Sequence, residues 1–78
     1  MKIELKLYAS LTHHMPEQKA ESGFIEVREG MTIGEVLDYL KIPGDAIKII
    51  FLNGVHAKVD EIPKEGDRLG VFPPVAGG

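Results

Sequence analysis

A single helical pattern lies between two groups of strand-like segments, and this order constrains the fold more than any other feature. The chain has 78 residues, which is enough for one small domain with a single core. Residues 2–8 alternate polar and apolar side chains as a half-buried strand does, and residues 24–28 repeat this alternation. We expect the two strands to form an antiparallel pair. Residues 9–23 have no clear periodicity and are predicted to be a surface connection with one helical turn near residues 10–14.

A capping box marks the start of the helix. The hydroxyl of Thr32 can accept a hydrogen bond from a free backbone amide, and the Glu35 carboxylate can accept one from the backbone N–H of Thr32. The residue before a proline avoids helical conformation, so Ile42-Pro43 predicts the end of a helix that spans residues 33–41. The apolar side chains at helical spacing, which would face the sheet, are Ile33, Val36, Leu37 and Leu40.

The rest of the chain is predicted to form strands and tight turns. Residues 47–52 are mostly β-branched or aromatic, and the Asn53-Gly54 pair after them tolerates the positive φ angles of a hairpin turn. A short return strand at residues 55–57 and a final strand at residues 68–72 follow. Two strands, one helix and two or three more strands predict an α+β fold of the β-grasp kind, with a mixed sheet of four to five strands packed on one main helix.

The β-grasp arrangement would bring aromatic side chains together on the open face of the sheet. Its first and last strands lie side by side at the centre, so Tyr8 would lie close to Phe72. Phe51 would join them if its two neighbours in the strand point inward, and a register shift of one residue would bury it instead. Contiguous exposed aromatic area is typical of interaction sites. We therefore predict a partner-binding surface formed by these three residues, with His56 at its rim.

Composition excludes several classes of function. Cysteine is absent, which excludes disulfides, thiolate catalysis and cysteine-ligated metal, and the net charge of −3 without a basic run argues against nucleic acid. No apolar stretch could span a bilayer and no signal peptide precedes the first strand, so we expect a cytoplasmic protein that does not bind membranes. The histidines lack converging ligands, and no phosphate-binding glycine loop or activated nucleophile is present. We expect no bound metal, no intrinsic cofactor and no independent active site.

The chain ends in a slender uncharged tail, which we expect to be its reactive site. Glycine has no Cβ, so Gly77 and Gly78 can enter a narrow channel and present the terminal carboxyl group of Gly78 to a partner. The alternative is a frayed terminus, but such ends tend to be polar. Prolines at the base of the tail would stiffen it and limit the entropy lost on insertion. The predicted tail, at residues 73–78 of a single domain that spans residues 1–78, consists of Pro73, Pro74, Val75, Ala76, Gly77 and Gly78.

These features resemble those of the ubiquitin-like sulfur carriers of molybdopterin and thiamine biosynthesis. The likeness rests on the Asn-Gly turn at residues 53–54, the Glu-Gly-Asp turn at residues 65–67 and, above all, the ending Phe-Pro-Pro-Val-Ala-Gly-Gly at residues 72–78. It covers nearly the whole chain, and the Phe-Pro-Pro stem is more similar to the small subunit of molybdopterin synthase than to the thiamine carrier. Residues 9–23 depart from the helical segment that is commoner at this place in the family.

The resemblance implies a function in sulfur transfer. An E1-like enzyme would use ATP to adenylate the Gly78 carboxylate, and a sulfur donor would then displace AMP to leave a thiocarboxylate. The large subunit of molybdopterin synthase would accept the tail and use its sulfur to build a molybdenum or tungsten pterin cofactor. Catalysis would take place in these partners, so the chain itself would be a carrier and not an enzyme.

Three alternatives stay open. The chain could carry sulfur for thiamine or another sulfur-containing metabolite, or it could be a ubiquitin-like modifier that is attached through Gly78 to lysines of other proteins. It could also be a passive interaction domain that uses only the aromatic face. Removal of Gly78 would abolish every one of these functions except the last.

Overall fold

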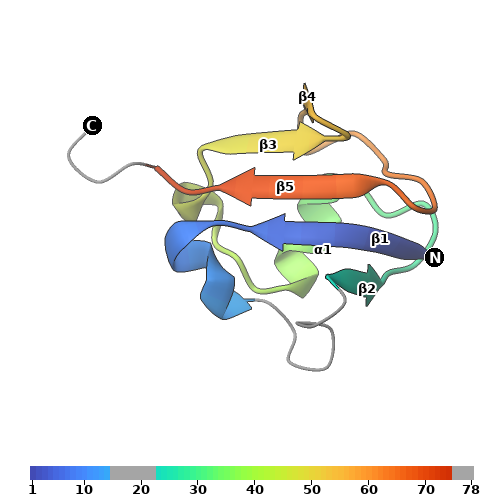
Figure 1. Ribbon diagram of the computed structural model, residues 1–78, viewed down its shortest axis with the longest axis horizontal. Coiled ribbons are helices and arrows are strands. Elements are labelled where there is room, and N and C mark those ends of the chain that lie inside the picture. Colours follow the sequence, from blue (N-terminus) through green and yellow to red (C-terminus); the bar gives the residue numbers. More distant parts are fainter. Residues whose placement is uncertain (15–22, 75–78) are drawn as a thin grey trace.

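The computed structural model describes residues 1–14 and 23–74, which form one mixed sheet covered by one α-helix. The strand order is β2-β1-β5-β3-β4, with β1 and β5 parallel and the other neighbours antiparallel (Figure 1). This is the β-grasp topology that the order of the elements predicts, including the antiparallel pair of the first two strands. The elements are β1 (Lys2–Leu7), η1 (Ala9–His14), β2 (Phe24–Glu26), α1 (Ile33–Tyr39), η3 (Gly44–Ala46), β3 (Ile49–Leu52), β4 (Val55–His56) and β5 (Arg68–Phe72).

The core lies between α1 and one face of the sheet, and Figure 1 shows α1 behind the strands. Strand alternation decides which side chains enter it, because successive residues point to opposite faces. The central strands and the helix supply its most deeply buried members: Ile3, Leu5, Leu69, Val71, Ile33, Val36 and Leu37. Buried and more exposed residues therefore alternate along β1, as the sequence pattern of residues 2–8 predicts, and also along β5.

The predicted capping box begins the helix. The backbone N–H of Glu35 donates to the Thr32 hydroxyl at 3.1 Å, and the backbone N–H of Thr32 donates to the Glu35 carboxylate at 2.9 Å. The next two free amides are bound by the loop that follows β4, since Ile33 N–H donates to the Glu61 carbonyl and Gly34 N–H to the Val59 carbonyl, both at 2.8 Å. The first three backbone amides of the helix, those of Ile33, Gly34 and Glu35, therefore all have hydrogen-bond partners.

The helix ends at Tyr39, which is earlier than the predicted boundary at residue 41. Lys41 has a φ of 61°, and its N–H donates to the Asp38 carbonyl at 2.9 Å. The N–H of Ile42 reaches back to the Leu37 carbonyl at 3.0 Å. This pair of bonds is a Schellman motif, which ends a helix with a residue in the left-handed region. The helix predicted from the position of Pro43 was too long, because the backbone leaves the helical conformation at Lys41, before the proline is reached.

Four strand boundaries also differ from those predicted. β1 ends at Leu7 and not at residue 8, β2 ends at Glu26 and not at residue 28, and β4 ends at His56 and not at residue 57. A 3-10 turn, η3, precedes the third strand, so β3 begins at Ile49 and not at residue 47. The connection after β1 contains the predicted helical turn as the 3-10 helix η1, whose Leu11 is buried in the core. The remainder of the predicted surface connection, residues 15–22, lies outside the described residues. Among the described helices, none is long and apolar enough to cross a membrane.

The predicted hairpin turn joins β3 to β4. Asn53 and Gly54 have φ values of 54° and 81°, as a type I′ turn requires at both central positions. The Asn53 side chain also accepts a hydrogen bond from Arg68 N–H at 2.9 Å and donates one to the Asp67 carboxylate at 3.1 Å. The turn is thus tied to the start of β5, which fixes β5 against β3.

Candidate functional site

Three aromatic side chains meet on the open face of the sheet, which is the face away from α1. The rings of Tyr8 and Phe72 are stacked, with 4.0 Å between their centroids and 5° between their planes. Phe51 meets Phe72 edge to face, with centroids 5.7 Å apart and an interplanar angle of 87°. The structure therefore brings together the three residues as predicted, and Phe51 lies on the open face. We refer to Tyr8, Phe51 and Phe72 as the aromatic cluster.

Strand pairing explains why the cluster forms. Leu7 is paired with Val71 across the parallel β1–β5 ladder, so Tyr8, directly after β1, lies beside Phe72, the last residue of β5. In the antiparallel β3–β5 ladder Phe51 is paired with Gly70, which puts it on the same face as Phe72. Tyr8 is 39% exposed, whereas the two phenylalanines are half-buried because their rings pack on each other. The cluster therefore combines a fixed geometry with accessible apolar area.

His56 lies at the rim of the aromatic cluster, on the outermost strand. It is paired with Phe51 in the β3–β4 ladder, and the centroids of the two rings are 6.0 Å apart with a tilt of 59°. Its side chain is exposed. The position agrees with the prediction, while a role in binding a partner stays a prediction.

The tail begins directly beside the cluster. The carbonyl of Phe72 accepts a hydrogen bond from the backbone N–H of Lys48 at 2.8 Å, and the chain leaves the sheet after this bond. Pro73 is half-buried and Pro74 is exposed. The predicted reactive residues Gly78 and Gly77, and with them Ala76 and Val75, lie outside the described residues. A protein that contacted the aromatic cluster would also lie beside the base of the tail.

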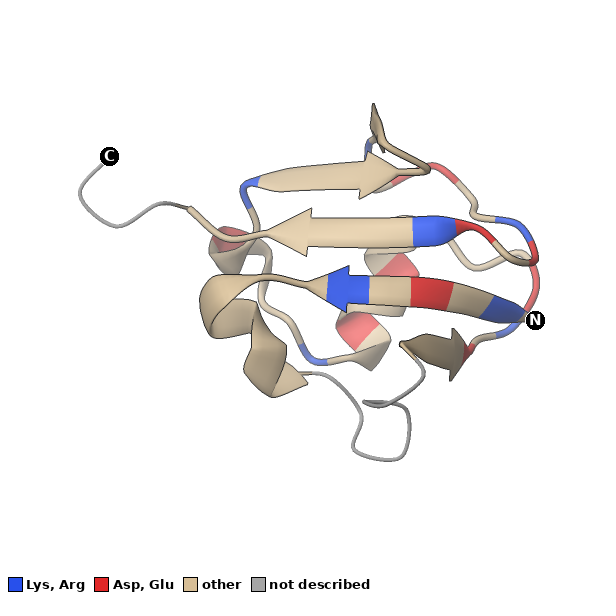
Figure 2. Ribbon diagram, in the orientation of Figure 1, with Lys and Arg blue, Asp and Glu red and all other residues tan. Residues whose placement is uncertain are grey.

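The polar part of the open face lies on β1 and at the start of β5. Figure 2 shows charged bands on these strands and none on β3 or along the rest of β5. Arg68 donates from Nε to the Glu4 carboxylate at 3.1 Å. Lys6 is paired with Gly70 in the β1–β5 ladder. The aromatic cluster is therefore bordered on one side by the Lys6 ammonium group and by the Arg68–Glu4 ion pair.

A hollow that the sequence analysis did not identify lies between the cluster and these charges. It has a volume of about 290 Å³, and its lining includes Lys6, Arg68, Gly70 and the three rings of the aromatic cluster. The signal in the sequence was a glycine in the middle of an otherwise strand-forming segment, Arg68–Phe72. The sequence pattern alone assigns no role to Gly70, because its surroundings are set by the neighbouring strands β1 and β3.

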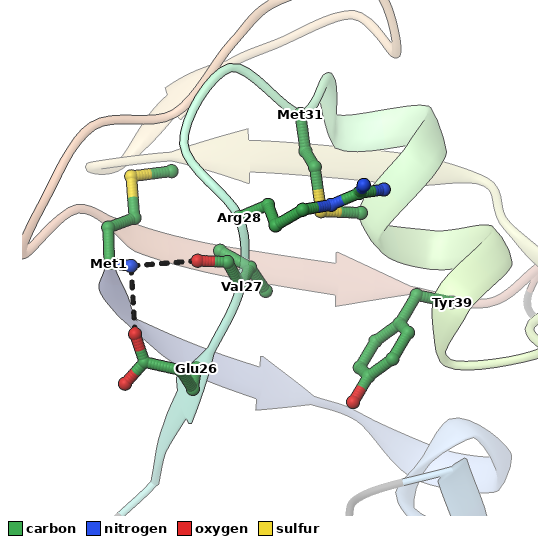
Figure 3. Close-up of a pocket in the computed structure, with 6 residues that line it drawn as sticks. All are labelled: Met1, Glu26, Val27, Arg28, Met31 and Tyr39. Atoms are coloured by element: carbon green, nitrogen blue, oxygen red, sulfur yellow. Dashed lines mark hydrogen bonds and ion pairs between the residues drawn. The ribbon is translucent and has the colours of Figure 1, made fainter.

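A second hollow, of about 510 Å³, lies between the start of β1, β2 and α1 (Figure 3). The ammonium group of Met1 donates to the Glu26 carboxylate and to the Val27 carbonyl, both at 2.8 Å. The pKa of this ammonium is raised above its ordinary value, chiefly because of the hydrogen bond to Glu26. Met31 and Tyr39 complete one wall, as Figure 3 shows. β1 and β5 are parallel, so this hollow lies at the opposite end of the sheet from the base of the tail.

The adjacent histidines of η1 do not form part of either hollow. His14 places Nδ1 3.3 Å from the Leu40 carbonyl, while His13 is exposed. In residues 1–14 and 23–74, no group of three His, Asp or Glu side chains is arranged to hold a metal ion.

The fold and the aromatic cluster at the base of a Gly-Gly tail define a small ubiquitin-like carrier or modifier. The model of the ThiS family matches residues 12–78, so the chain belongs to the ThiS family of ubiquitin-like sulfur carriers. Members of this family are not catalytic themselves, and the chain is accordingly not an enzyme. Among the curated proteins, none matches this sequence significantly.

Several solved structures resemble this chain at about one quarter identity. SAMP1 from Haloferax volcanii is 26% identical, with all of both chains covered and a TM-score of 0.69. A putative molybdopterin converting factor, subunit 1, from Pyrococcus furiosus is also 26% identical, with 96% of this chain and 99% of that chain covered and a TM-score of 0.62. A complex of subunits 1 and 2 of the molybdopterin-converting factor from Helicobacter pylori 26695 contains a 20% identical chain, with all of both chains covered and a TM-score of 0.60, which shows the shared fold alone.

Proposed function

We propose that this protein carries sulfur as a thiocarboxylate on Gly78 and serves as the small subunit of a molybdopterin synthase. The observation that carries the proposal is the aromatic cluster at the base of the Phe-Pro-Pro stem, in a chain of the ThiS family. The cluster gives a partner a fixed apolar surface to bind, and the stem begins at Pro73, directly after the cluster residue Phe72. The similarity to the Pyrococcus furiosus protein supports this assignment within the family.

The chemistry requires two steps in partner proteins. An oxygen of the Gly78 carboxylate attacks the α-phosphorus of ATP on an E1-like enzyme, which releases pyrophosphate and forms an acyl-adenylate. A sulfide nucleophile then attacks the carbonyl carbon, the bond to AMP breaks, and a thiocarboxylate remains. A free carboxylate is a poor electrophile, so the adenylate divides one difficult substitution into two easier ones. Gly77 and Gly78 leave the reacting carbonyl unhindered because neither has a side chain.

The proposed partners follow from this sequence of steps. An E1-like enzyme binds the form of the protein that ends in a carboxylate, and this enzyme supplies ATP. The large subunit of molybdopterin synthase binds the thiocarboxylate form. The pterin that receives the sulfur would go on to hold molybdenum or tungsten. Both partners would use the aromatic cluster, so they would bind in turn and not together.

A second candidate function is that of a protein modifier, which the similarity to SAMP1 supports. Here a lysine amine of another protein would attack the carbonyl of the Gly78 adenylate, the bond to AMP would break, and an isopeptide bond would form. A sulfur carrier for thiamine or another metabolite would use the same activation but a different acceptor. All three functions share the adenylation step and differ in the nucleophile or acceptor that follows it.

The test of the shared step is the intact mass of the protein after incubation with ATP, sulfide and the E1-like enzyme of the same organism. The expected result is the mass gain that corresponds to the replacement of one oxygen atom by a sulfur atom. Fragmentation in the mass spectrometer should assign this gain to Gly78. A variant that lacks Gly78 is the control and should show no increment. An unmodified mass, with an enzyme that is active on its known carrier, would contradict the proposal.

A second measurement separates the molybdopterin assignment from the protein modifier. The thiocarboxylate form is incubated with the large subunit of molybdopterin synthase and its pterin substrate, and dithiolene formation is followed. Product formation that depends on Gly78 supports the molybdopterin assignment. Failure of this transfer, together with isopeptide-linked adducts of Gly78 isolated from cells, would instead establish the modifier.

A further inference from the structure

We propose that the hollow over Gly70 is a socket that receives one aliphatic side chain of the E1-like partner, next to a carboxylate of that partner that pairs with Lys6. The inference rests on the proposed function and adds the chemistry by which the partner recognises the sheet. It concerns the bare stretch of backbone at the centre of the open face.

Glycine at position 70 is not required by the fold. Gly70 is not among the described residues with positive φ. A Cβ built on it would contact only Tyr8, at 3.7 Å, which is an ordinary van der Waals distance. Glycine inside a strand lowers stability, and it often marks a place where another molecule approaches the backbone closely. The fold would therefore tolerate a side chain that the surface lacks.

The missing side chain leaves a depression with defined walls. In the two ladders that flank β5, Gly70 is paired with Lys6 on one side and with Phe51 on the other. Arg68 and Phe72 are two residues away along β5 and point to the same face. The aromatic rings and the aliphatic stems of the two basic residues form apolar walls around the backbone of Gly70.

The size and openness of the hollow favour a side chain of a protein over a free small molecule. Its volume of about 290 Å³ is at the lower limit for a small-molecule pocket. It is also open on the solvent side, so a small ligand would keep much of its surface in water. A partner that already covers the aromatic cluster would close this open side, and a central pocket filled by one apolar anchor is typical of protein interfaces.

Charge gives the second half of the recognition. The guanidinium group of Arg68 is already bonded to Glu4. Within residues 1–14 and 23–74, the ammonium group of Lys6 forms no ion pair. A partner carboxylate next to the inserted side chain would pair with the Lys6 ammonium group, which no carboxylate of the described residues neutralises.

The test uses three variants of the full chain and the E1-like enzyme of the same organism. Gly70→Leu fills the socket, Lys6→Gln removes the charge, and Gly44→Leu is a matched control. Gly44 lies in η3, does not line the hollow over Gly70, has no positive φ and has open space where its Cβ would be. The rate of ATP–pyrophosphate exchange is measured as a function of carrier concentration, and thermal unfolding shows that each variant is folded.

We expect Gly70→Leu to raise the KM for the carrier roughly tenfold, with kcat little changed, because it blocks an anchor and not the reacting carboxylate. Lys6→Gln should raise KM less and should weaken its dependence on salt. Gly44→Leu should match the wild type. A KM for Gly70→Leu within about twofold of the wild-type value would overturn the proposed socket. The proposed function would still stand in that case, because the wild-type protein would support ATP–pyrophosphate exchange. No exchange with the wild type, on an enzyme active with its known carrier, would overturn both.

Discussion

The rings of Tyr8 and Phe72 are parallel and 4.0 Å apart, although the two residues come from opposite ends of the chain. They meet because β1 and β5 are adjacent parallel strands that finish at the same edge of the sheet. The pair therefore exists before any partner binds, and it stands where the tail begins. A preformed aromatic anchor reduces the side-chain entropy that is lost on association.

Replacement of Phe72 by alanine should weaken binding to a cognate partner roughly tenfold or more, because it removes the ring that contacts both other members of the aromatic cluster. Tyr8→Ala should have a similar effect of smaller size. The measurement is the Kd for the E1-like enzyme by calorimetry. Tyr39→Ala is the matched control, since Tyr39 is a 63% exposed aromatic on α1. Wild-type affinity in both cluster variants would contradict a binding role for this face.

Loss of the capping hydroxyl in Thr32→Ala should lower the free energy of unfolding by about 1 kcal/mol. The Thr32 hydroxyl accepts the backbone N–H of Glu35, and alanine leaves that amide without this partner. Thr32→Ser keeps an acceptor at the same place and should lose much less. Urea denaturation of the three proteins measures the difference, and equal stability of the alanine and serine variants would contradict the capping role.

Gly34→Ala should destabilise the protein by roughly 1 kcal/mol, although alanine ordinarily stabilises a helix relative to glycine. The new Cβ would lie 3.3 Å from both the Cβ and the carbonyl oxygen of Val59. That carbonyl accepts the Gly34 N–H at 2.8 Å, so the loop cannot move away without weakening a hydrogen bond. Gly44→Ala, with open space at the Cβ position, is the control for the glycine change. A melting temperature above that of the wild type for Gly34→Ala would show that the loop adapts.

The ammonium group of Met1 should make stability fall with alkaline pH. Its pKa is raised in the folded state, chiefly by the hydrogen bond to Glu26, so the folded protein holds this proton more tightly than the unfolded chain. The contribution is complete below the ordinary α-amino pKa of about 8 and is lost as pH rises through the higher folded value.

The variant Glu26→Gln removes this charge pair and tests its effect on the pH dependence of stability. Urea denaturation between about pH 7 and pH 10 should show a smaller fall in stability for Glu26→Gln than for the wild type, since other titrating groups act equally on both. A parallel pH dependence of the two proteins would show that the pair contributes nothing to folding.

Local sequence patterns were sufficient to predict most of the elements. The alternation in β1 and β5, the capping box at Thr32 and the Asn53-Gly54 turn each depend on residues within a few positions of one another. Such patterns predict the type of an element well, but they predict the residues at which it begins and ends poorly. The helix boundary was wrong because Lys41 adopts the left-handed conformation usually taken by glycine, and no short-range pattern marks a lysine for it.

The sequence by itself determined which side chains face the core and that the chain forms a β-grasp domain, because both follow from periodicity and from the order of the elements. Only the tertiary structure decided the geometry of the open face. The stacking of Tyr8 on Phe72 and the walls around Gly70 depend on the register between strands that are distant in the sequence. Register is set by the packing of the whole core, and a shift of one residue would turn Phe51 inward and remove both the cluster and the socket.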